Sequence, residues 1–152
     1  MKLWASCKGC LETEERFAQM TDDEFSTFMQ ASVLAGMAIA YTGTSIPHGL
    51  SYTLTYENGV PHGKAVGVFL SGFLKKYGDS IEAGYVVKQL LDFDDLDAFR
   101  DYIRTLFGKL DMSEKLWKKD RDGILANPAK LKNYPFELTA DVLDDYVRYY
   151  NA

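Results

Sequence analysis

The sequence predicts an all-α domain, a helical bundle of about seven helices. Apolar residues recur at helical spacing, strand-like alternation is nearly absent, and capping residues precede the periodic segments while Gly or Pro follows them. The chain has 152 residues, 47% hydrophobic and 26% charged, which is enough for one globular domain with a sizeable core. We therefore expect a single helical domain over residues 1–152.

The first half of the chain is expected to contain the central helix. Residues 3–19 indicate one or two weak helical pieces, and Thr21 with Glu24 has the form of a capping box at the start of the next helix, which should run to about residue 42. Residues 31–41 of this helix are small or apolar on almost every side, which is typical of a helix that is buried all round. We therefore expect them to form the centre of the core.

The remaining helices are predicted over residues 47–57, 61–77, 80–91, 94–107, 113–125 and 138–149. Leu50–Tyr56 alternates as a strand would, but Pro47 favours a helix start and Gly59 a helix stop, so we interpret this segment as helical. Helical spacing of apolar residues supports the helices over residues 61–77, 80–91 and 94–107. Ser113 caps the helix over 113–125, which ends before Asn127-Pro128, and Thr139 is placed to cap the last. The expected core residues include Met37, Ile39, Phe69 and Phe73.

Charge and composition exclude several classes of function. Lys and Arg total 17 against 22 Asp and Glu, a net charge of −5, which disfavours a nucleic-acid binder. The longest apolar runs fall short of the roughly 20 residues that span a bilayer, so no membrane partner is expected. The two cysteines, Cys7 and Cys10, are too few for a disulfide framework, and we expect a cytoplasmic protein.

The candidate chemistry lies in a repeated tripeptide. Pro47-His48-Gly49 and Pro61-His62-Gly63 contain both histidines of the chain, 14 residues apart. In each, Pro favours a helix start and places His in the first turn, where the helix dipole disfavours imidazolium. A neutral imidazole keeps a lone pair for a metal ion, although two ordinary helix-start histidines would give the same pattern.

Several motifs together carry a family resemblance. They are the small-residue helix segment LAGMA, the spacing from Gly43 to His48, the second Pro-His-Gly, and the C-terminal Asn127-Pro128 with Leu138-Thr139-Ala140-Asp141. Residues 28–75 strongly resemble the C-terminal helical domain of the iron-containing (group III) alcohol dehydrogenases, which is dehydroquinate synthase-like, and the likeness continues more loosely to residue 152.

The resemblance implies a metal-dependent NAD(P) alcohol dehydrogenase that oxidises primary alcohols or reduces aldehydes. His48 and His62 match two metal ligands of the family, whose ion is Fe²⁺ or sometimes Zn²⁺. Many members carry a second histidine four residues after the first, near the nicotinamide, and here this position is Tyr52. One helical turn places Tyr52 on the face of His48, so its phenol is a candidate proton-transfer group, although helical tyrosines more often pack.

Two departures from the family limit this expectation. The upstream Asp-x-x-x-His that supplies two further ligands has no counterpart here, because His48 and His62 are the only histidines. No glycine-rich turn follows a strand, so the N-terminal dinucleotide-binding domain is expected to be absent. The chain alone is therefore expected to hold metal weakly and to be inactive.

Two alternatives remain open from the sequence. Cys7 and Cys10 with His48 and His62 have the ligand types of a Cys₂His₂ zinc site, but not the spacing of a zinc finger. The second alternative is a non-catalytic helical interaction module, which would form homo-oligomers through apolar helix faces left exposed.

Overall fold

The computed structural model describes residues 13–78, 85–132 and 134–152, and within these ranges it is helical with no strand. The helical segments are α2 (Glu14–Ala18), α3 (Asp22–Thr42), α4 (Ile46–Asn58), α5 (His62–Lys75), the π-helical η2 (Tyr85–Leu90), α7 (Leu96–Phe107), α8 (Glu114–Leu125), α9 (Pro128–Leu131) and α10 (Ala140–Asn151). The predicted all-α class is confirmed. Nine segments are assigned in these ranges, because short pieces such as α9 stand between the longer helices.

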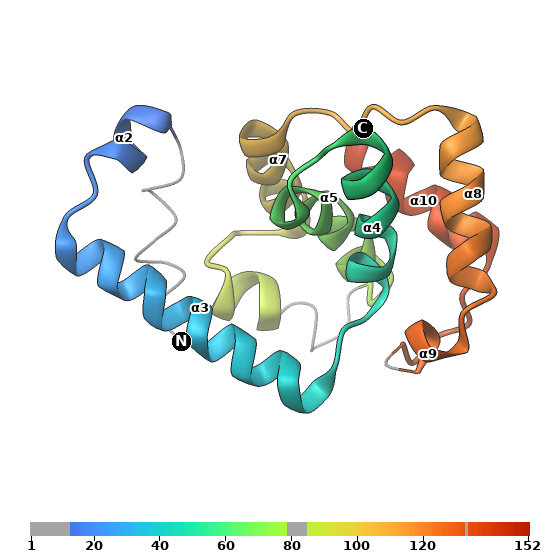
Figure 1. Cartoon of the computed structure of the whole chain (residues 1–152), viewed down its shortest axis with the longest axis horizontal. Coiled ribbons are helices and arrows are strands. Elements are labelled where there is room, and N and C mark those ends of the chain that lie inside the picture. The colour runs from blue at the N-terminus through green and yellow to red at the C-terminus, as the bar shows by residue number, and fades with distance from the viewer. Residues whose placement is uncertain (1–12, 79–84, 133) are drawn as a thin grey trace.

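The core lies within a bundle of the longer helices that follow α3 (Figure 1). Helix α5 contacts α4, α7 and α10, and α8 closes the bundle against α4 and α10. Burial of their apolar faces is the main source of stability for such a bundle. The most deeply buried hydrophobic residues are Ile46, Leu50, Leu54, Ala65, Val68, Phe69, Val87, Phe99, Ile103, Leu143, Tyr146 and Tyr150.

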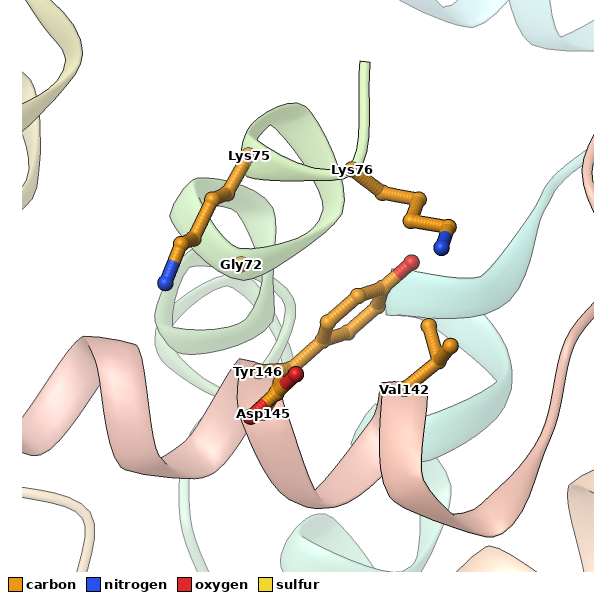
Figure 2. A pocket seen from close by; sticks show the side chains of 6 residues that line it. All are labelled: Gly72, Lys75, Lys76, Val142, Asp145 and Tyr146. Carbon is orange, nitrogen blue, oxygen red and sulfur yellow. The ribbon is translucent and has the colours of Figure 1, made fainter. Parts of the chain in front are cut away.

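The crossing of α5 and α10 depends on a glycine. A Cβ atom on Gly72 would lie 2.6 Å from the Cα atom of Tyr146, which is too close for any other residue without movement of the backbone. Figure 2 shows Tyr146 from α10 beneath this turn of α5, beside a small pocket of about 110 Å³ that Lys75 and Lys76 also line. Gly72 therefore allows α10 to pack directly on the central helix.

The position of residues 31–41 corrects the sequence prediction. Helix α3 contains no buried residue, and Val33 and Met37 are 58% and 54% exposed. Ile39 is also exposed, so neither it nor Met37 belongs to the core, whereas Phe69 is fully buried and Phe73 packs against the core. An apolar helix surface is more stable when it is removed from water, but its composition does not indicate which surface will cover it.

Most predicted helix boundaries are confirmed. Thr21 and Glu24 form both hydrogen bonds of the capping box, and Thr139 accepts a hydrogen bond from the backbone of Val142. The segment from Leu50 to Tyr56 is helical. The helix expected over residues 80–91 is described only from residue 85, where it is π-helical, and the early helical pieces are described only from residue 13.

A buried carboxyl group joins α8 to α4. Asp120 is 6% exposed, and its Oδ1 atom accepts a hydrogen bond of 2.7 Å from the Thr53 hydroxyl. Its Oδ2 atom is buried without a hydrogen-bond partner in the described part of the chain. Burial raises the pKa of Asp120 to about 6, against the lowering effects of the Thr53 hydrogen bond and the Lys119 charge. The folded protein therefore holds the proton of Asp120 to a higher pH than the unfolded chain does.

Asp120→Asn is expected to change how stability depends on pH. The pKa of Asp120 is higher in the folded protein than in the unfolded chain. The neutral acid therefore contributes fully to the free energy of unfolding below the pKa of the unfolded chain, and this contribution is lost as pH rises through about 6. The amide cannot ionise and can still accept from Thr53. Above about pH 7 the variant should therefore be more stable by about 2–3 kcal/mol, with little difference at about pH 3, below the unfolded pKa. Urea unfolding across this range measures the effect, and a constant difference between the two proteins would contradict it.

Candidate metal centre

A reversal of the chain between α4 and α5 places the two histidines near each other. His48 lies in the first turn of α4, which has proline in its first turn as predicted, and His62 is the first residue of α5. Gly59 ends α4 in the left-handed conformation (φ 67°), and the Val60 N–H donates back to the Leu54 carbonyl at 3.2 Å. The chain then returns alongside α4 instead of continuing away from it.

The two imidazole rings face one site. The ring centroids of His48 and His62 are 5.5 Å apart, with an interplanar angle of 64°. The Tyr52 ring is stacked on His62 at 6.0 Å with an angle of 8°, so all three predicted site residues are brought together. His48 is partly buried and His62 is exposed, so the site lies at the surface of the bundle.

Ser51 orients the His62 ring. This serine is fully buried, and its hydroxyl donates to the His48 carbonyl at 2.7 Å. The same oxygen lies 3.2 Å from Nδ1 of His62 and, having used its proton, can only accept there. We infer that Nδ1 carries the ring proton, which leaves the lone pair on Nε2. Metal-ligating histidines are commonly oriented in this manner by a partner on the second ring nitrogen.

The environment of His48 favours its neutral form. Burial lowers the pKa of His48 most, and the nearby His62 and the positive charge of Lys130 lower it further. A lowered pKa reduces competition between protons and a metal ion for the imidazole lone pair near neutral pH.

Lys130 is a component of the site that sequence reasoning missed. It comes from α9, and its Nζ atom lies 5.1 Å from the centroid of the Tyr52 ring and 3.1 Å from Oγ1 of Thr44. No local motif indicates this position, because 86 residues separate Lys130 from Thr44. Ser51 was missed as well, although its spacing of three residues from His48 places both on one helix face.

The described residues contain no complete metal site. Among residues 13–78, 85–132 and 134–152, no group of three or more His, Cys, Asp or Glu side chains is placed to hold an ion. Cys7 and Cys10 lie outside the described residues, so the zinc-site alternative is untested. His48 and His62 are compatible with the role of two neutral ligands, since their ring centroids lie 5.5 Å apart and the inferred tautomer leaves the Nε2 lone pair of His62 unused by Ser51.

The structure is a helical bundle that brings two imidazole rings together at its surface. Residues 13–122 match the Fe-containing alcohol dehydrogenase family, C-terminal. The chain belongs to this family, whose members are iron-dependent alcohol dehydrogenases. His48, Ser51, Tyr52 and His62 lie within the matched residues, whereas Lys130 lies beyond them. No curated protein and no solved structure matches the chain.

Ser51→Ala is expected to change which ring nitrogen of His62 carries the proton. Without the buried oxygen, the ring proton loses its acceptor at Nδ1 and should redistribute toward Nε2. The ¹⁵N chemical shifts of the two ring nitrogens measure the proton position. Ser51→Thr, which keeps the hydroxyl, is the matched control. Equal ¹⁵N shifts in wild type and Ser51→Ala would show that the serine does not set the tautomer.

Proposed function

We propose that this chain provides the metal-binding helical domain of an NAD(P)-dependent alcohol dehydrogenase, with His48 and His62 as two of the metal ligands. The observation that carries the proposal is the proximity of the two imidazoles, whose ring centroids are 5.5 Å apart, on the surface of a domain that belongs to the iron-containing alcohol dehydrogenase family. The substrate class is a small primary alcohol or its aldehyde.

The role of each residue follows from its position. When bound, Fe²⁺ or Zn²⁺ supplies Lewis acidity toward the alcohol oxygen. His48 and His62 offer imidazole lone pairs, and Ser51 holds the His62 ring in the tautomer that directs Nε2 away from the buried hydroxyl. Tyr52, 42% exposed and stacked on His62, is placed at the edge of the site to donate or accept a proton through its phenol.

Hydride transfer requires a second component. Nicotinamide cofactors are usually held at a glycine-rich turn between a strand and a helix, and the part of the chain that the structure describes contains no strand. We propose that NAD(P) is bound by a separate nucleotide-binding domain. The helical domain would then contribute the metal ligands and one wall of the cleft that aligns substrate and nicotinamide.

Histidine substitutions test the metal assignment. Titration of the purified chain with Co²⁺, followed by visible absorption, should show weak binding, because two neutral ligands provide no charge to balance a divalent ion. His48→Ala and His62→Ala should each weaken binding by at least about tenfold. Tyr52→Phe, which removes only the phenol oxygen, serves as the control and should bind Co²⁺ as wild type does.

The result that would contradict the assignment is Co²⁺ binding of equal strength in wild type and both alanine variants.

The same samples distinguish metal binding from turnover. With the metal added, the 152-residue chain alone should give no alcohol-dependent NAD(P)H formation, because the proposal places the cofactor on another domain.

The exposed helix α3 favours a second candidate function, self-association. Its residues 25–42 contain no charged side chain, and Leu34 is 55% exposed. No described helix combines the length and hydropathy needed to cross a membrane. A second copy of the chain could cover this surface by helix-to-helix packing, which removes apolar area from water.

Leu34→Glu is expected to reduce self-association if α3 forms the interface, because a carboxylate would be buried among apolar groups. Light scattering after size exclusion gives the mass of each protein. Gln30→Glu adds the same charge one helical turn earlier, at a position that is already polar, and should have a smaller effect. A monomeric wild-type protein would contradict this candidate function.

A further inference from the structure

Lys130 places a fixed positive charge at the edge of the histidine pair. Its Nζ atom donates to Oγ1 of Thr44 at 3.1 Å and lies 5.1 Å from the centroid of the Tyr52 ring. It is also close enough to His48 for its charge to act on that ring. Residues from two segments, the link before α4 and α4 itself, therefore lie next to the ammonium group that α9 supplies.

The stem of Lys130 is packed and does not extend freely into solvent. A Cβ atom on Gly49 would lie 3.6 Å from Cγ and 3.7 Å from Cδ of Lys130, so these methylenes run along the first turn of α4. The side chain as a whole is partly buried. A stem held in this manner limits the positions of the ammonium, which lowers the entropy that a ligand must remove on binding.

The site has positive charge without a matching carboxylate. Within the described ranges Lys130 takes part in none of the ion pairs, which join other lysines and arginines to Asp or Glu. An ammonium has three N–H donors, and the Thr44 hydroxyl accepts one. The rings of His48, His62 and Tyr52 supply no negative charge near it. Such a group attracts an anion, and the described residues do not provide one.

We propose that Lys130, oriented by Thr44, forms an oxyanion subsite beside His48 and His62, and that this subsite binds the carboxylate of a small hydroxy acid or the corresponding oxo acid. The carboxylate accepts hydrogen bonds from the Lys130 ammonium, and the hydroxyl or carbonyl oxygen of the same ligand faces the imidazole pair. The subsite itself does not depend on a metal. The choice of a ligand that also carries a hydroxyl or carbonyl rests on the proposed dehydrogenase function.

The two histidines provide a direct probe of ligand binding. Because the chain contains only His48 and His62, their ring proton signals can be followed individually by NMR. Glycolate is the probe, and ethylene glycol, in which a second hydroxymethyl group replaces the carboxylate, is the neutral control. At fixed, mildly alkaline pH and constant ionic strength, glycolate should shift the ring signals in a saturable manner, whereas ethylene glycol should not.

Substitutions assign the effect to Lys130. Lys130→Met keeps an unbranched stem against Gly49 but removes the charge, and it should weaken glycolate binding by about tenfold, as expected for loss of a charge-assisted hydrogen bond. Lys130→Arg keeps the charge and should retain most of the binding. Lys132→Met is the matched control, because it removes an exposed positive charge two residues away at the end of α9 and should bind glycolate as wild type does.

Three results would overturn the proposal: no glycolate-dependent shift in wild type, equal shifts with ethylene glycol, or equal glycolate affinity in wild type and Lys130→Met. The outcomes are separate from those of the metal experiment. If His48→Ala leaves Co²⁺ binding unchanged while glycolate binding still requires Lys130, the metal assignment fails and the subsite stands. If Co²⁺ binding requires both histidines but glycolate binding is insensitive to Lys130, the subsite fails and the metal assignment stands.

Discussion

The reversal of the chain after α4 determines both the core and the site. The left-handed Gly59 and the hydrogen bond from Val60 to Leu54 return the backbone along the helix that it has just left. Helix α5 therefore packs against α4 and lies in the middle of the bundle, where Phe69 is buried. The same reversal brings His62 over Ser51, so the packing of the central helix and the orientation of an imidazole have one origin.

Charge distinguishes this site from a complete metal centre. In the proposed site, two neutral imidazoles would bind a divalent ion through lone pairs without offsetting its charge, and Lys130 adds a further positive charge beside them. An anionic ligand at Lys130 would reduce this repulsion and so favour the cation at His48 and His62. Cation and anion binding at the site are therefore expected to strengthen each other, as linked equilibria require.

The helix starts could be predicted from the sequence, because short-range interactions determine them. The capping box at Thr21, the proline at the start of α4 and the paired Pro-His-Gly segments are short-range signals, and the structure contains the helix starts that they indicate. The burial of residues 31–41 was predicted wrongly, because apolar composition does not specify which surface covers a helix. Lys130 was not predicted at all, since it reaches the site only when α9 packs against α4.

The exposed α3 surface and the unbalanced positive charge at the histidine pair would be satisfied by different partners. Covering α3 requires another apolar surface, and any helix with a matching apolar face could provide it, because the hydrophobic effect has no directional requirement. Balancing the charge at Lys130 requires an anion at hydrogen-bond distance from one ammonium, which is a directional and chemically selective demand. A second copy of the chain that covers α3 would thus leave the need for an anion unchanged, provided that it brings no carboxylate to Lys130. We therefore expect self-association through α3 and anion binding at Lys130 to be independent of each other.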